Sequence, residues 1–228
     1  MPVFFLSERK VFPSPDLARK DGLLAIGGDL SEERLILAYQ LGIFPWFSDD
    51  SPILWWSPDP RLVLFPNELH ISKRLKRTIK KCTFEVSFDK AFKEVIEFCA
   101  KIKRKGQDGT WIGKEMMEAY LNLYYSGFAH SVECWQNGNL VGGLYGVSLG
   151  RVFFGESMFS KVTDASKVAL ITLVQKIKKW DFKFIDCQVT TSHLMSLGAR
   201  EIPRKKFLRI LNEALKSPAY RGSWSLLD

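Results

Sequence analysis

The chain has 228 residues, of which 46% are hydrophobic, 25% charged and 13% aromatic. This composition excludes a disordered chain, a collagen and a coiled coil, and at about 100–200 residues per domain the length allows one large domain or two small ones. Lysine and arginine (33) outnumber aspartate and glutamate (25), and the net charge of +8 favours polyanionic partners such as nucleic acids.

Residues 1–60 differ from the rest of the chain, because they hold seven of its ten prolines. One clear helix is predicted here, at residues 32–41, with Ser31 as a candidate cap and Gly42 at its end. Prolines break both helices and strand ladders, so the aromatic-rich stretch that follows is expected to be irregular. We interpret residues 1–60 as a small N-terminal domain.

From residue 61 the hydrophobic pattern becomes regular. The predicted elements are strand 62–65, helix 72–81, strand 84–88, helices 91–103 and 114–126, strands 130–135, 140–147 and 151–159, helix 165–180, strand 182–189, and helices 192–197 and 204–215. After residue 84 this order resembles the acyltransferase fold of the GNAT superfamily, in which a mixed sheet opens around an activated acyl donor. We therefore predict an α+β protein whose residues 61–228 form a GNAT-like catalytic domain with a mixed, mainly antiparallel sheet.

Basic residues crowd the predicted helix 72–81, where six of nine consecutive positions are lysine or arginine. Lys73, Arg77, Lys80 and Lys81 share one face of that helix. Such a ridge can neutralise the phosphates of a nucleic acid, whereas a charge run alone is more often a solvated helix face. Nothing in the cluster is suited to reading bases, so any contact is expected to be with the backbone.

Trp46 and Trp111 lie in loop-like contexts beside proline or near glycine. A tryptophan in such a place can stack on a nucleobase, which is worth about 1–3 kcal/mol, or it can pack between two domains. Both interpretations stay open for these two residues, while Trp55 and Trp56 resemble the start of a buried strand.

Two predicted central strands carry carboxylates among apolar residues. Asp186 and Gln188 are two positions apart, so strand alternation places them on one face and Cys187 on the other. Glu156 lies among aromatic residues on another strand. Burying an unpaired carboxylate is costly, so each needs a partner or a chemical role. Asp186 has the alternatives of capping the next helix or pairing with a lysine, but two such residues near a cleft favour a functional site.

Several common motifs are missing. Residues 160–167 contain no glycine where a coenzyme A pyrophosphate loop is expected, and there is no Walker loop, dinucleotide fingerprint or nucleophile elbow. Four scattered cysteines and three histidines make no zinc signature, so we expect reduced, mostly buried thiols and no metal. Cys187 has no evident base. His193 has the right position for a general base, but a capping or surface role is favoured.

No stretch approaches the roughly 18 apolar residues of a membrane-spanning helix. The N-terminus also lacks a basic leader and a small-residue cleavage site. We therefore expect a cytoplasmic protein with no membrane partner.

Seven motifs are spread along most of the chain: GGDL (27–30), GIFPWF (42–47), WWSPDPR (55–61), GESMFS (155–160), ASK (165–167), IDCQV (185–189) and SLGA (196–199). Together they resemble the leucyl/phenylalanyl-tRNA–protein transferases, a bacterial, cytoplasmic family with a small N-terminal domain and a GNAT-like domain. The resemblance implies transfer of leucine or phenylalanine from aminoacyl-tRNA to proteins that begin with arginine or lysine, which marks those proteins for degradation.

The resemblance also implies site residues. The catalytic group corresponds to Glu156, Asp186 and Gln188, the tryptophans near the terminal adenosine to Trp46 and Trp111, and the tRNA-binding helix to Lys73, Arg77, Lys80 and Lys81. The aminoacyl pocket corresponds to Leu144, Phe153, Met158, Leu170, Leu173 and Ile185. Pocket depth selects an unbranched apolar side chain, so methionine is expected as a donor and valine and isoleucine are not.

The expected mechanism needs no cofactor, because the ester donor is already activated and the main task is to position two substrates. The family resemblance implies that Gln188, polarised by Asp186, acts as the base. A neutral amide oxygen is a very weak base, so we expect Asp186 and Glu156 to orient the acceptor's amine and cationic side chain. Gln188 then hydrogen-bonds the amine or the ester, and the tRNA hydroxyls relay the proton. A monomer is expected.

Two other classes of function remain in view. An acyl-CoA-dependent GNAT transferase is disfavoured by the missing pyrophosphate loop. A non-catalytic RNA-binding protein fits the basic ridge and the tryptophans, but it leaves Glu156 and Asp186 unexplained.

Overall fold

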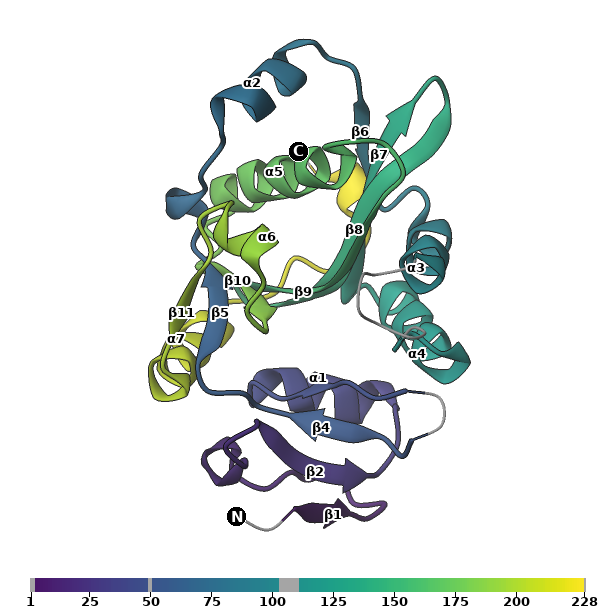
Figure 1. The fold of residues 1–228 in the computed structure, drawn as a ribbon. Helices are drawn as coiled ribbons and strands as arrows, with labels where there is room; N and C mark the ends of the chain where they lie inside the picture. The colour runs from purple at the N-terminus through teal and green to yellow at the C-terminus, as the bar shows by residue number, and fades with distance from the viewer. Residues whose placement is uncertain (1–2, 49–50, 103–110, 228) are drawn as a thin grey trace.

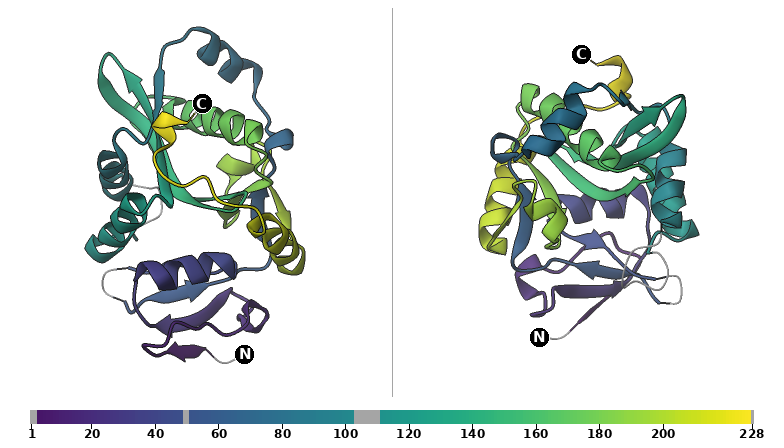
Figure 2. Two further views of the ribbon diagram at one scale, coloured as in Figure 1. Left: turned by 180° about the vertical axis from the view of Figure 1, so that it is seen from behind. Right: turned by 45° about the horizontal axis from the view of Figure 1, so that its top comes forward.

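The structure is a computed structural model that describes residues 3–48, 51–102 and 111–227. It is an α+β fold with one small and one large sheet, as predicted, and helix α1 (Glu32–Gln40) lies between them (Figure 1). None of the helices in these ranges is long and apolar enough to span a membrane. The views in Figure 2 show the small sheet at one end of the molecule and helix α2 (Lys73–Lys80) at the other.

The small sheet has the strand order β1–β2–β4–β3. Its strands are β1 (Phe4–Leu6), β2 (Leu23–Gly27), β3 (Phe44–Pro45) and β4 (Leu54–Trp56). The expectation of an irregular stretch after Gly42 is therefore wrong in part. Pro45 is accommodated because β3 is a two-residue edge strand, where a missing N–H costs little. Ser31 does not cap α1, since its hydroxyl accepts a hydrogen bond from Lys10 Nζ at 2.8 Å instead.

The large sheet has seven strands in the order β11–β5–β10–β9–β8–β7–β6. They are β5 (Arg61–Leu64), β6 (Glu85–Phe88), β7 (Ala129–Gln136), β8 (Asn139–Leu149), β9 (Val152–Ser160), β10 (Phe184–Gln188) and β11 (Arg200–Ile202). Within the described ranges β9 and β10 form its one parallel pair, so the predicted mixed, mainly antiparallel sheet is confirmed. The boundary predicted near residue 60 falls between β4 and β5 and stays a prediction.

Helices cover both faces of the large sheet (Figure 1). They are α3 (Phe92–Lys101), α4 (Lys114–Tyr125), α5 (Ala165–Lys179), α6 (Ser192–Met195) and α7 (Arg204–Leu215). The predicted α7 agrees at both ends, whereas the predicted end of α3 at Lys103 lies outside the described residues. Gly142 on β8 lets α5 pack closely, because a Cβ there would lie 2.5 Å from the Cβ of Ala165.

Candidate active site

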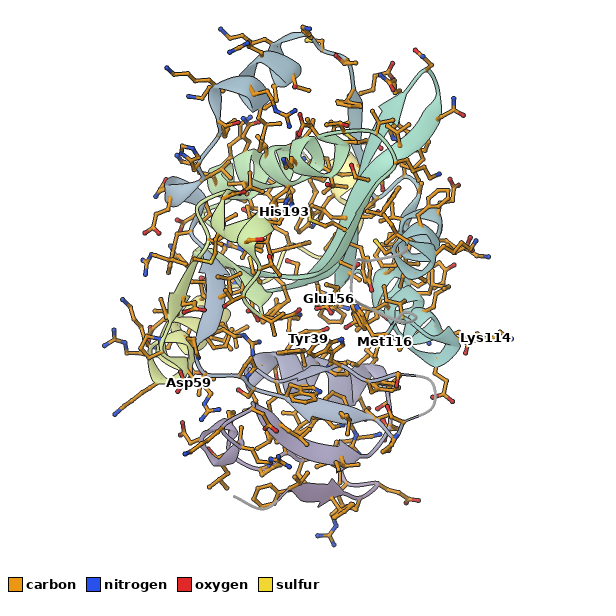
Figure 3. All side chains as sticks on the ribbon, in the orientation of Figure 1. Tyr39, Asp59, Lys114, Met116, Glu156 and His193 are labelled. Carbon is orange, nitrogen blue, oxygen red and sulfur yellow. The ribbon has the colours of Figure 1, made fainter. Side chains whose placement is uncertain are left out.

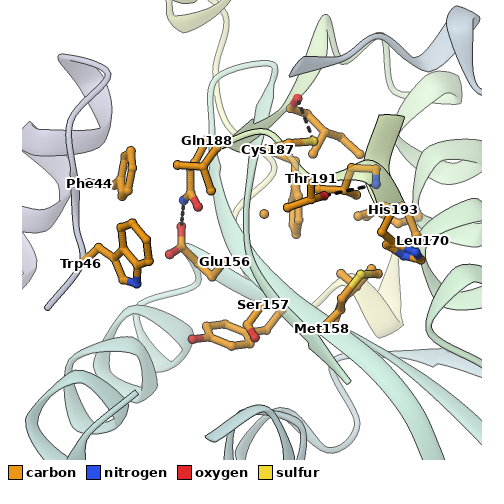
Figure 4. A pocket seen from close by; sticks show the side chains of 18 of the residues that line it. Phe44, Trp46, Glu156, Ser157, Met158, Leu170, Cys187, Gln188, Thr191 and His193 are labelled. Atoms are coloured by element: carbon orange, nitrogen blue, oxygen red, sulfur yellow. Dashed lines mark hydrogen bonds between the residues drawn. The ribbon is translucent and has the colours of Figure 1, made fainter. Parts of the chain in front are cut away.

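A pocket of about 330 Å³ opens between the large sheet, α5 and α6, with β3 of the small sheet at its edge (Figure 4). Eight residues that the sequence associated with substrate binding line it together: Leu144, Phe153, Met158, Leu170, Leu173, Ile185, Trp46 and Trp111. The volume falls within the usual range for small-ligand sites. Most of the wall is therefore apolar, as a pocket for an apolar side chain requires.

The sheet register explains why distant residues meet in this wall. Leu144 on β8 pairs with Met158 on β9, and Phe153 on β9 pairs with Ile185 on β10. Leu170 and Leu173, three positions apart on α5, complete the wall from the helix side. A single continuous apolar surface follows from these pairings.

The two tryptophans lie in the same pocket. Trp46 is 37% exposed, so it is not buried in an interdomain core. Its carbonyl oxygen accepts a hydrogen bond from Trp56 Nε1 at 2.7 Å, which fixes its backbone. Trp55, by contrast, is fully buried, as expected. Trp46 thus presents part of its ring to solvent and to the pocket.

Glu156 is a buried carboxyl group at the rim of the pocket. Its Oε1 lies 2.9 Å from the Tyr39 hydroxyl and accepts a hydrogen bond from Gln188 Nε2 at 3.0 Å, while its Oε2 lies 2.7 Å from the Tyr120 hydroxyl. Figure 3 shows Tyr39 and Glu156 at the junction of the two sheets. Burial raises the pKa of Glu156 from 4.5 to about 7, although the hydrogen bonds oppose this shift. Glu156 therefore titrates near neutral pH.

Sequence reasoning did not identify Tyr39 and Tyr120. The two hydroxyl groups come from α1 and α4 and lie 2.5 Å apart. Both residues are fully buried, and their positions on apolar helix faces indicate core packing. No local spacing relates them to Glu156, because the tyrosines lie 117 and 36 residues from it in the chain.

Asp186 is an internal residue that does not line the pocket. Arg61 donates to its Oδ1 from Nε at 2.8 Å and to its Oδ2 from Nη2 at 2.7 Å, and neither side chain is more than 1% exposed. The guanidinium of Arg61 also lies over the rings of Phe44 and Phe207, at 4.8 and 4.6 Å. The partner of Asp186 is thus an arginine, neither the helix cap nor the lysine that were open alternatives.

The expectation that Asp186 and Gln188 share a face is wrong. The register of β10 shifts between these residues, and Gln188 has φ +62°, so strand alternation ends at this bulge. Cys187 and Gln188 both line the pocket, while the backbone N–H of Gln188 donates to Asp186 Oδ1 at 3.0 Å. The Arg61–Asp186 pair therefore supports the turn that presents Gln188.

Two further candidates from the sequence also line the pocket. The pKa of the Cys187 thiol is raised by burial and by Asp186, which keeps it protonated and a poor nucleophile. His193 is half-buried near Leu170, at the end of the pocket away from Glu156 (Figure 4). The capping alternative for His193 is wrong, because Thr191 caps α6. The surface alternative stays a prediction. Burial and nearby Lys167 lower the pKa of His193.

The basic residues of α2 are outside the pocket. Lys73, Arg77, Lys80 and the adjoining Lys81 are exposed, while Leu75 is buried. The four cations stand on a solvated ridge, which we call the α2 ridge. Exposure is expected both for a tRNA-binding surface and for a solvated helix face, so the tRNA-binding role of the α2 ridge stays a prediction.

An apolar pocket with a few polar groups at its rim is typical of a site that binds a small apolar ligand group. The profile described as "Leucyl/phenylalanyl-tRNA protein transferase" matches residues 63–212, and the profile of the N-terminal domain of the same transferase matches residues 28–59. The chain belongs to the leucyl/phenylalanyl-tRNA–protein transferase family.

Relatives support this assignment over nearly the full length. The chain is 58% identical over 224 residues to a leucyl/phenylalanyl-tRNA–protein transferase of Syntrophobacter fumaroxidans, covering 98% of this chain and 96% of that one. It is also 58% identical over 226 residues to one of Desulfatibacillum aliphaticivorans, covering 99% of this chain and 97% of that one.

Among solved structures, L-PGS from Bacillus licheniformis is similar with a TM-score of 0.40 and 13% identity, covering 74% of this chain and 54% of that chain.

Proposed function

We propose that this protein transfers leucine or phenylalanine from aminoacyl-tRNA to the α-amine of proteins that begin with arginine or lysine, which marks them for degradation. The observation that carries the proposal is the pocket itself, in a member of this transferase family. Six apolar side chains line it, and the hydrogen-bonded pair Glu156–Gln188 lies at its rim. Aminoacyl-tRNA is a cytoplasmic molecule, so the proposal places the reaction in the cytoplasm.

The donor side chain enters the apolar part of the pocket. One methylene in such a pocket is worth only about 1–3 kcal/mol, so methionine is accepted beside leucine and phenylalanine. Valine and isoleucine carry a branch at Cβ, next to the reacting ester, where the pocket meets the buried Glu156 and Gln188. Selection against them is therefore steric.

The tRNA is held at two places. Its terminal adenosine stacks against Trp46 and Trp111 at the pocket, and the α2 ridge contacts its phosphates. Contacts to the backbone carry no sequence information, so different tRNA sequences serve equally well.

Gln188 contacts the reacting groups. Because its Nε2 donates to Glu156, its carbonyl oxygen is left to accept a hydrogen bond from the acceptor's amine. Attack forms the C–N bond and breaks the ester C–O bond. The amine proton passes, through the neighbouring tRNA hydroxyl, to the departing ribose oxygen, which becomes a hydroxyl. The side-chain oxygens of Asp186 are bound by Arg61, so Asp186 acts as a positioning residue behind Gln188.

The acceptor is selected by charge. Glu156 becomes negative as the pH rises through about 7, which favours a cationic arginine or lysine side chain at the rim. A free α-amine has a pKa of about 7.7–8.0, so a useful fraction of it is neutral and nucleophilic under the same conditions.

The test is a transfer assay with purified protein, leucyl-tRNA and a peptide that begins with arginine, read by mass spectrometry. A matched peptide that begins with aspartate is the control. A leucine-sized gain on the arginine peptide alone supports both the reaction and the acceptor rule. No gain while tRNA still binds would overturn the proposal in favour of an RNA-binding protein.

Acyl-CoA as an alternative donor fits poorly. The residue before α5, where a pyrophosphate would bind, is Asp164, and a carboxylate at that position repels a pyrophosphate. That carboxylate is already paired with Arg74 at 3.0 Å and with Lys167 at 3.3 Å. Acetyl-CoA is therefore expected not to bind in a calorimetric titration.

A further inference from the structure

Glu156, Tyr39 and Tyr120 form a closed ring of oxygen–oxygen contacts. The Tyr39 and Tyr120 hydroxyls are 2.5 Å apart, and they lie 2.9 and 2.7 Å from the two oxygens of Glu156. These three contacts need three protons if each is a hydrogen bond. The two phenols supply only two, because each hydroxyl carries one proton. An ionised carboxylate supplies none, so the ring then lacks one proton.

We propose that Glu156 carries a proton in the resting protein and closes this ring, with Tyr39 and Tyr120 as positioning residues that set its charge. With this proton, each of the three oxygen–oxygen contacts of the ring holds one hydrogen bond. Glu156 Oε1 still accepts a hydrogen bond from Gln188 Nε2. The burial of all four side chains, none more than 9% exposed, favours this neutral arrangement.

The groups that face Glu156 from the surrounding elements agree with a neutral carboxyl. Tyr39 comes from α1, Tyr120 from α4 and Gln188 from β10, and Tyr145 of β8 packs edge-on against Tyr120 at 5.4 Å. The negative charge of Asp186 raises the pKa of Glu156 further, and that charge is itself paired with Arg61 of β5. Phenolic and amide donors give a carboxylate weaker support than an ion pair does.

The consequence for the reaction rests on the proposed function. Gln188 is held in one orientation in both protonation states, because Oε1 accepts its N–H either way. The charge at the rim changes, however, so the protein takes a cationic acceptor best once the ring has released its proton. Glu156 neither gives nor takes a proton in the transfer reaction itself, so the reaction does not consume the proton of the ring.

Infrared spectroscopy of the free full-length protein tests the ring directly. The C=O band of a protonated carboxylic acid is expected in the wild type at pH 6 and is expected to be absent from Glu156→Gln. On raising the pH it disappears with a midpoint near 7. Tyr39→Phe and Tyr120→Phe shift that midpoint or the band position, since either opens the ring.

Tyr124→Phe is the matched control. Tyr124 is on the same helix as Tyr120, but its hydroxyl donates to the backbone carbonyl of Asp89 at 3.0 Å. Its removal is expected to leave the Glu156 band and midpoint unchanged. Spectra of wild type and Glu156→Gln with no carboxylic acid difference at pH 6 would overturn the proposal. This readout needs no tRNA, so the ring and the transfer activity can fail independently.

Discussion

Glu156 and Asp186 are both buried carboxyl groups on the paired strands β9 and β10, yet their surroundings differ sharply. Asp186 is held by Nε and Nη2 of Arg61 and lies outside the pocket. Among the residues that the structure describes, the side-chain partners of Glu156 are two hydroxyl groups and one amide, and Glu156 lies at the pocket rim. Asp186 is thus paired with an arginine and supports the fold, whereas Glu156 titrates near neutral pH where the substrates meet.

The largest effect is expected from breaking the Arg61–Asp186 pair. Arg61→Met leaves a buried, uncompensated carboxylate, which should lower the free energy of unfolding by about 3–5 kcal/mol in urea denaturation. Arg200→Met is the matched control, because Arg200 makes the same two-donor contact with Glu68 at the surface. That change should cost about 1 kcal/mol or less. Equal effects of the two substitutions would contradict the structural role of the buried pair.

A smaller effect is expected from the pH dependence of stability. Burial raises the pKa of Glu156 to about 7 in the folded protein from an ordinary 4.5, so the folded state binds this proton more tightly. Its contribution is therefore full below about pH 4.5 and is lost as the pH rises through about 7, by up to about 3 kcal/mol. Denaturant titrations from pH 4 to 8 should show this fall in the wild type and not in Glu156→Gln. Superimposable profiles would show that folding does not raise the pKa of Glu156.

The smallest effect concerns the α2 ridge, which lies away from both carboxyl groups. Lys73→Gln or Arg77→Gln should weaken leucyl-tRNA binding and lower the slope of log affinity against log salt by about 1 each. Lys205→Gln on α7, also exposed, is the control and should leave the slope unchanged. Stability should change by less than about 0.5 kcal/mol in all three. An affinity that does not change from low to high salt would show that the α2 ridge does not bind tRNA phosphates.

Much of the fold followed from local patterns. The periodicity of α7, the turn chemistry between β7 and β8, and the order of elements from β6 to α6 were predictable, because each depends on neighbouring residues. The three-residue edge strand β11, which pairs with β5, was not predicted. The small sheet was harder, since the short strands β1 and β3 are defined by long-range pairing and carry little pattern of their own.

The site was predictable only where motifs or register sufficed. Pocket residues such as Met158 and Ile185 were named from the family resemblance, and the sheet brings them together. Tyr39, Tyr120 and Arg61 were missed because their partners are far away in the chain. The bulge in β10 also defeated the alternation argument, since one shift of register moves a side chain to the other face.

The most direct test of the account is the single-turnover rate of leucine transfer by Gln188→Met with saturating leucyl-tRNA and an arginine-starting peptide. Methionine is close in size to glutamine but offers no amide to either the amine or Glu156. If Gln188 positions the reacting amine at this pocket, the rate should fall by roughly 100-fold while the unfolding midpoint stays close to that of the wild type. A variant that folds and transfers leucine at the full rate would contradict the assignment of the chemistry to the Glu156–Gln188 pair.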